Sequence, residues 1–175
     1  VLNTSKAADL QWDLKTYRNE KSVSYENRYA EIYFENDGKV DYAGLGKQED
    51  ETLEKATFVA YKQHFFSSIL LSQAPIANVK VSSTDLVNDA KIDTVFTKQF
   101  KTTLPLAFKN GELDYKMNWY YGPTDYKLLN KYDKNIEDIV PLGWGIFGWI
   151  NKLIFIPLFG FLSSFMGLGI AIIVF

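Results

Sequence analysis

Apolar and polar residues alternate along most of the first 138 positions, and this alternation gives way to a nearly uninterrupted apolar run at the C-terminal end. Side chains at every second position share one face of a β-strand, so a period of two predicts strands with one buried face. We expect a mainly β fold. The clearest runs are 28–35, 39–42, 57–61, 65–71, 76–82, 94–101 and 113–121.

Turn residues separate these runs and predict how the strands connect. Asn36-Asp37-Gly38 predicts a tight hairpin, because such a turn requires positive φ angles. Pro75 is expected to end the run before it, and Gly122-Pro123 ends the last run because proline cannot donate to a strand ladder. Many short strands with turns between them favour an antiparallel β-sandwich over a βαβ fold.

Two stretches of the first 138 residues depart from the strand pattern. Up to Asn27 the pattern is less regular: Trp12 and Leu14 alternate, whereas the polar residues at 19–21 fit a loop. Residues 124–132 predict a short helix, with Thr124 or Asp125 as its N-cap.

The distribution of charge divides the chain more sharply than any turn. All acidic residues lie at or before Asp138, and Lys152 is the only charged residue from 139 to 175. At a rise of about 1.5 Å per residue, the uncharged run 153–175 is long enough to match a hydrocarbon core of about 30 Å. Pro157 and the glycines at 167 and 169 nevertheless predict two pieces rather than one helix.

We therefore predict an interfacial amphipathic helix over 144–165 and the start of a transmembrane helix at Leu168. The expected domains are 1–138, a β-sandwich incomplete at its N-terminus; 139–167, the interfacial region; and 168–175, the start of the transmembrane helix. The alternative is the buried core helix of a soluble protein, which would need a larger soluble domain. The expected membrane-interface residues are Trp144, Phe147, Trp149, Ile150, Lys152, Phe155 and Phe159. The expected transmembrane residues are Ile170, Ile172, Ile173, Val174 and Phe175.

Composition and isolated polar residues argue against several classes of function. A net charge of −2 does not favour binding to nucleic acid, and the absence of cysteine removes disulfides and thiolate metal sites. His64 is the only histidine, and no Ser/His/Asp set accompanies it. The aspartates at 85, 89 and 93 lack the glycine and glutamate of a calcium loop. We expect no catalytic residue, no metal site and no cofactor.

Four stretches occur in an order that resembles the YidC membrane insertase family, most closely its Bacteroidetes-type members. Phe58–Ser68 is similar to a family segment in which a hydrophobic strand runs into an aromatic pair and small residues. Tyr120–Pro123 is similar to the element that ends the family's periplasmic domain. Gly143–Ile150 looks like the entry to its amphipathic periplasmic-surface helix, and Gly169–Phe175 is placed like the start of the first core helix.

The resemblance implies a β-supersandwich in the periplasm of a bacterium, anchored in the inner membrane. It implies a non-enzymatic role in the insertion and folding of membrane proteins, alone or with the Sec translocon. The implied partners are the lipid bilayer, nascent membrane proteins and Sec translocon components, and the ribosome only through parts outside this sequence. The family's hydrophilic groove carries a basic residue that would lie beyond Phe175, so no groove residue is assigned.

Two other functions remain open on the residues alone. The aromatic and lysine residues of 115–119 could line a sugar platform, which would make the chain a membrane-anchored, carbohydrate- or ligand-binding domain. An exposed sheet edge could instead dock partners of the translocation machinery.

Overall fold

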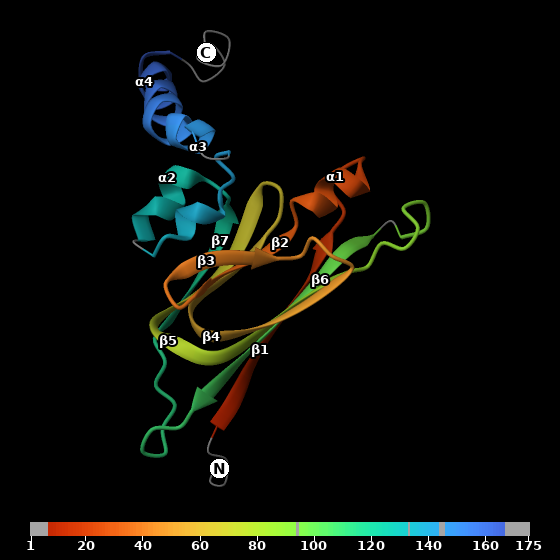
Figure 1. Ribbon diagram of the computed structural model, residues 1–175, viewed down its shortest axis with the longest axis vertical. Coiled ribbons are helices and arrows are strands. Elements are labelled where there is room, and N and C mark those ends of the chain that lie inside the picture. The colour runs from red at the N-terminus through yellow and green to blue at the C-terminus, as the bar shows by residue number, and fades with distance from the viewer. Residues whose placement is uncertain (1–6, 94, 133, 144–145, 167–175) are drawn as a thin grey trace. The chain divides into compact units, whose positions relative to one another are not determined.

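The computed structural model describes residues 7–93, 95–132, 134–143 and 146–166, and it divides into two compact units, 1–139 and 140–175. The first unit holds the sheet and the second holds the C-terminal helix (Figure 1).

The first unit is built on one seven-stranded antiparallel sheet. Its order is β1-β6-β5-β4-β2-β3, and β7 pairs with the first part of β5. The predicted mainly antiparallel β fold is therefore confirmed. The strands are β1 (Ala7–Tyr17), β2 (Glu31–Asn36), β3 (Lys39–Ala43), β4 (Gln48–Lys62), β5 (Phe66–Asp85), β6 (Phe96–Ala107) and β7 (Met117–Pro123).

The two facing layers of the predicted sandwich come from this one sheet folding onto itself. Trp12 of β1 stacks on Tyr61 of β4 with ring centroids 3.7 Å apart, although β6 and β5 lie between these strands in the sheet. The Tyr61 hydroxyl donates to the Trp12 carbonyl at 2.7 Å. A twisted sheet can bury both layers in this way, because its side chains from distant strands meet across one concave face.

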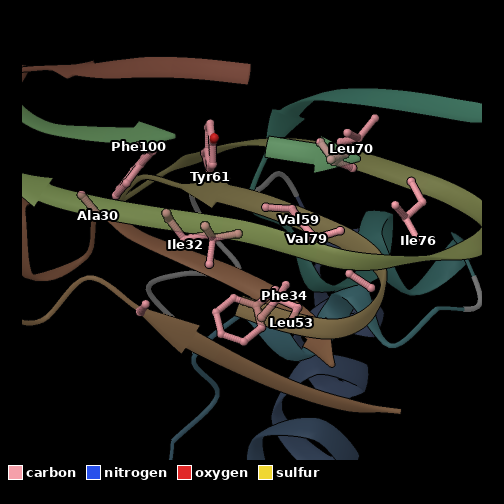
Figure 2. Packing of buried hydrophobic residues seen from close by; sticks show 14 residues of the cluster. Ala30, Ile32, Phe34, Leu53, Val59, Tyr61, Leu70, Ile76, Val79 and Phe100 are labelled. Atoms are coloured by element: carbon pink, nitrogen blue, oxygen red, sulfur yellow. The ribbon is translucent and has the colours of Figure 1, made fainter. Parts of the chain in front are cut away.

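The hydrophobic core lies within this fold and draws on most of the strands (Figure 2). Ile32, Val79 and Phe100 are completely buried, and Tyr61 lies beside Phe100 with ring centroids 5.2 Å apart. Leu10, Trp12 and Leu14 of β1 are partly buried against the cluster, which confirms the alternation noted at the start of the chain.

The β2–β3 hairpin confirms the turn expected at Asn36-Asp37-Gly38. Asp37 has φ 49° and Gly38 has φ 86°, the left-handed values that such a turn needs. Glu35 accepts hydrogen bonds from the Gly38 backbone nitrogen and, at 2.9 Å, from that of Thr57. The carboxylate therefore ties the hairpin to β4.

The prediction that Pro75 ends a strand is wrong, because β5 continues through it for 20 residues. The β4–β5 pairing passes from Ala56↔Ile76 to Phe58↔Leu71, so four residues of β5 bulge opposite one residue of β4. Pro75 lies in this bulge, where a missing N–H interrupts no ladder.

A short helix, α1 (Val23–Arg28), occupies residues to which the sequence assigned no element, together with Arg28, which was expected to begin a strand. The Ser22 hydroxyl caps it by accepting from the Tyr25 nitrogen. Val23 and Glu26 are buried, and the Glu26 carboxylate accepts from the backbone nitrogen of Asn19 at 2.9 Å. Local caps rather than a long periodic pattern hold this helix.

Short helices follow β7: α2 (Tyr126–Leu129), η1 (Asn130–Tyr132) and η2 (Ile136–Ile139). The predicted cap is confirmed at Asp125, whose carboxylate accepts from the Leu128 nitrogen at 2.8 Å. Leu129, Ile136 and Ile139 are completely buried, and Tyr132 meets Tyr120 of β7 edge-on. This segment therefore covers the face of β7 that carries Tyr120.

Candidate membrane-interface helix

The second unit is dominated by one helical segment that runs from Ile146 to Phe165. It consists of α3 (Ile146–Ile150), the π-helical turn η3 (Asn151–Phe155) and α4 (Ile156–Phe165). Met166 follows in an extended conformation, with φ −123° and ψ 149°. The helix therefore ends where the glycine-rich sequence after Phe165 predicted a break.

The π turn accommodates the proline within the helix. The Ile156 nitrogen donates to the Asn151 carbonyl, five residues back, instead of the usual four. Pro157 comes next and has no backbone hydrogen to donate. The change in the backbone hydrogen-bond pattern therefore occurs just before the missing donor. The helix predicted over 144–165 already included Pro157, and in the structure this proline follows a π turn within a continuous helix.

The π turn also aligns the small and polar residues of the two halves. In an unbroken α-helix, two residues twelve positions apart point in directions that differ by about 120° around the helix axis. A π turn contains one extra residue, which reduces this angle by about 100°. Two residues twelve positions apart on either side of the turn therefore point in directions within about 20° of each other. Such pairs are Gly148 with Gly160, Asn151 with Ser163, and Lys152 with Ser164.

Exposure follows this alignment. Gly148, Asn151, Gly160 and Ser163 are partly covered. Large apolar side chains at other positions are exposed, and an exposed apolar surface of this extent is unfavourable in water. These side chains and their exposed fractions are Phe147 70%, Trp149 59%, Leu153 55%, Ile154 48%, Phe155 42%, Leu158 43%, Phe161 60% and Phe165 75%.

The polar groups of the helix are largely paired within the unit. The Asn151 amide donates to the Leu142 carbonyl at 2.6 Å. The Ser163 hydroxyl donates to the Gly160 carbonyl at 3.0 Å, and the Ser164 hydroxyl to the Phe161 carbonyl at 2.6 Å. A hydroxyl that is paired inside its own helix can enter an apolar environment without losing a hydrogen bond.

The start of the helix depends on a close approach between two glycines. Gly143 adopts φ 100°, in the left-handed region. A Cβ atom on Gly148 would lie 2.7 Å from the Gly143 carbonyl oxygen, so a side chain at 148 would force the entry apart. The glycines of the entry segment are therefore required by its geometry.

The predicted interface residues fall partly within the described helix. Phe147, Trp149, Lys152 and Phe155 are exposed, whereas Ile150 and Phe159 are partly covered. Trp144 lies outside the described residues. So do all five predicted transmembrane residues, Ile170, Ile172, Ile173, Val174 and Phe175.

By length and composition the helix is able to cross a membrane. The stretch Phe147–Phe165 has 19 residues and a mean hydropathy of 1.3, and none of it is buried by the described chain. The alternative of a buried core helix is therefore not supported, because such a helix would be covered by the protein around it.

The sheet domain offers little sign of a chemical site. No group of three or more histidine, aspartate or glutamate side chains is placed to hold a metal ion in the described ranges. Lys62 forms a buried ion pair with Glu31 at 2.7 Å. Lys98 donates to the carbonyls of Asn27, Ala30 and Gly44, and burial lowers the pKa of its ammonium group. These buried charges are engaged in holding loops together.

The proposed sugar platform is occupied by packing contacts. Tyr115 packs against the core, and its hydroxyl accepts from the Ala107 nitrogen at 3.0 Å. Trp119 meets Trp12 edge-on at 4.8 Å. Both rings therefore contact the sheet, although Trp119 remains 43% exposed.

Comparisons with known proteins agree with this geometry. Residues 2–157 match the YidC periplasmic domain family. The chain is 32% identical over 174 residues to "Membrane protein insertase YidC" of Parabacteroides distasonis, covering 93% of this chain and 27% of that protein. It is 32% identical over 168 residues to the protein of that name from Porphyromonas gingivalis, covering 90% and 26%.

A third relative, "Membrane protein insertase YidC" of Bacteroides fragilis, is 30% identical over 174 residues, with 94% of this chain and 27% of that protein covered. The chain thus spans about a quarter of the length of these relatives. The match to a periplasmic domain of a membrane protein also agrees with the observed order of elements, in which an exposed apolar helix follows a folded β-domain. The chain belongs to the YidC family.

Proposed function

We propose that this chain is the part of a membrane protein insertase in which the periplasmic domain joins the membrane region. The protein assists the insertion and folding of integral membrane proteins, alone or with the Sec translocon, in the bacterial inner membrane. Residues 1–138 stand in the periplasm, 139–167 form the interfacial region and 168–175 begin the first core transmembrane helix. The names of the relatives support the insertase role.

The observation that carries this proposal is an exposed apolar helix that follows, in the sequence, a sheet domain with its own core. Phe147, Trp149 and Phe161 expose 70%, 59% and 60% of their surfaces, which only a lipid or protein partner would cover. Aromatic side chains such as Trp149 favour the headgroup region, and a lysine such as Lys152 can extend its ammonium group toward phosphates. We place the helix along the membrane surface on these grounds.

This arrangement supplies positioning rather than bond chemistry. The interfacial helix fixes the height of the sheet domain over the bilayer and steadies the transmembrane helices that follow. A groove between those helices would shorten the apolar path of a client's polar segment, for which each charged side chain at the bilayer centre costs about 2.5–3.5 kcal/mol on insertion scales. The described residues therefore support the transmembrane helices that form this groove.

Substitution of the aromatic anchors tests the proposal. In the full-length protein, Trp144, Phe147 and Trp149 are replaced together by Ser, and insertion of a single-span client into proteoliposomes is measured. Each buried aromatic side chain contributes about 1.5–3 kcal/mol, so insertion of the client should fall about tenfold or more. Tyr17→Ser with Tyr42→Ser, which removes exposed aromatic residues of the sheet domain, is the matched control.

Crosslinking to a client separates the insertase from the carbohydrate-binding alternative, which the comparisons do not favour. A photoreactive residue in the full-length protein should crosslink to a nascent membrane chain during its insertion. Crosslinks to no client, together with unchanged insertion in the triple Ser variant, would contradict the proposed function.

A further inference from the structure

The tip of the β4–β5 hairpin exposes a group of aromatic side chains that the core does not use. Phe65 and Phe66 are 63% and 62% exposed, and Tyr25 of α1 beside them is 45% exposed. No Asp, Glu, Lys or Arg occurs between Lys62 and Lys80, so the tip and the first part of β5 contain none of these residues. Adjacent exposed phenylalanines at a hairpin tip are costly in water.

The tip is held rigid by its neighbours. The His64 ring stacks on Tyr29 with centroids 4.6 Å apart and on Phe65 with centroids 4.1 Å apart. Tyr25 meets His64 edge-on at 5.4 Å, and the Glu20 carboxylate contacts the His64 Nδ1 atom. A loop that is already ordered loses little conformational entropy when it binds, so this tip is prepared for a contact.

The tip also lies where the chain leaves the sheet for the membrane segment. The Thr124 nitrogen donates to the Phe65 carbonyl at 2.8 Å, and the Thr124 and Ser67 hydroxyls are 2.6 Å apart. Tyr132 still contacts Tyr120 near the end of β7.

The tether to the membrane helix is short. Ile139 is buried in the sheet domain, and α3 begins at Ile146. Seven residue steps span at most about 25 Å. Chain connectivity alone therefore limits how far Ile139 can lie from a helix that is bound to lipid.

We infer that the β4–β5 tip is a second membrane contact of the protein, in which Phe65 and Phe66 enter the headgroup region of the bilayer that holds the C-terminal helix. The occupant is the lipid surface, because the tip is uncharged, aromatic and tied to the chain segment that leads into the membrane helix. His64 stacks on Phe65 and Tyr25 meets His64, and the polar atoms of these two side chains suit the wet side of this region. The contact limits the tilt of the sheet domain over the membrane.

The absence of native cysteine allows a direct test in lipid vesicles with the whole chain. Bimane is attached to single cysteines at Gln63, beside the tip, and at Leu113, an exposed residue before the opposite end of β7. Vesicles carry lipids with a shallow nitroxide. The Gln63 label should be quenched about threefold more than the Leu113 label, because interfacial groups lie about 5–10 Å deep. A label at Leu153 reports whether the helix itself is in the membrane.

Variants of the tip complete the test. Phe65→Ser with Phe66→Ser should reduce quenching at Gln63 to the level at Leu113, and Phe65→Leu with Phe66→Leu should preserve it. Equal quenching at Gln63 and Leu113 while Leu153 is quenched would overturn the inference and leave the helix anchor standing. If Leu153 were not quenched either, both the anchor and the tip contact would be rejected.

Discussion

The sheet domain and the C-terminal helix are both rich in large apolar side chains, but the sheet domain buries them whereas the helix exposes them. In the sheet domain, Ile32, Val79 and Phe100 expose nothing to solvent. In the helix, Phe147 and Phe165 expose 70% and 75% of their surfaces. The sheet provides its own apolar environment, whereas the helix requires one from outside. Similar residues are therefore buried in one region and left exposed in the other, which is the observation behind the proposed membrane contact of the helix.

The distribution of polar groups shows the same difference. The sheet domain carries nearly all the charged residues, and it buries a few of them in specific pairs such as Lys62 with Glu31. The helix has one charge, at Lys152, and its two serines bond to its own carbonyls. A segment that enters lipid must satisfy its polar groups internally, and the two serines of this helix do so.

The largest expected effect is on the sheet core. Phe100→Ala removes a completely buried ring that contacts Tyr61, and it should lower the free energy of unfolding of the sheet domain by about 3–5 kcal/mol. Phe161→Ala, at an exposed position of the helix, is the control and should leave that free energy within about 0.5 kcal/mol. Denaturant unfolding followed by near-UV circular dichroism measures both. Equal effects would remove the distinction between the two regions.

For membrane association we expect the opposite order: a substitution in the helix has the larger effect, and one in the sheet domain has none. Phe161→Asp exchanges an exposed apolar side chain of the helix for a charge, and it should weaken vesicle binding by about 2–3 kcal/mol. Ile92→Asp makes a similar change at a residue of the sheet domain that is 76% exposed, and binding there should not change. Vesicle flotation gives the bound fractions. Similar losses for both variants would mean that the helix is not the anchor.

A smaller effect is expected on the pH dependence of the stability of the sheet domain. Glu49 accepts a hydrogen bond from the Gly44 nitrogen at 2.6 Å and another from that of Gly46, and these donors hold the pKa of its carboxyl below the ordinary value of 4.5. A carboxyl whose folded-state pKa is depressed stabilises the fold above its unfolded pKa. That stability is lost as the pH falls through the folded-state pKa.

Glu49→Gln should therefore destabilise the sheet domain by about 1 kcal/mol at neutral pH. The difference between the variant and the parent should shrink below about pH 4.5. Unfolding curves between pH 3 and 7 would show it, with Glu51→Gln, an exposed neighbour, as the control. A difference that stays constant with pH would show that the carboxylate charge is not what stabilises this loop.

Much of the fold could be predicted from alternation and turn chemistry. The β2–β3 hairpin followed from Asp37-Gly38, and the end of β7 followed from Gly122-Pro123. The start of β4 did not, because residues 48–55 are largely polar and exposed and owe their strand conformation to pairing with β5. The helix α1 was missed because six residues held by a serine cap leave too short a period to recognise.

The position of the helix was predicted, but not its geometry, and the interface and transmembrane roles of the named residues remain predictions. The loss of charge after Asp138 and the aromatic residues around Trp149 located the helix. The π turn was not predicted, although Pro157 and the three pairs spaced twelve apart are its signals. An i→i+5 bond depends on neighbouring donors and carbonyls along the helix, and hydropathy alone does not report it.

Spin labels attached along the helix in lipid bilayers test the central claim most directly. Single labels at Leu153, Leu158 and Phe161 should be more accessible to oxygen than to a water-soluble nickel complex, and labels at Asn151 and Ser163 should match each other because the π turn aligns them. A label at Tyr17 of the sheet domain should show the water-exposed pattern. Helix labels as accessible to nickel as the Tyr17 label would contradict the proposal that lipid solvates this segment.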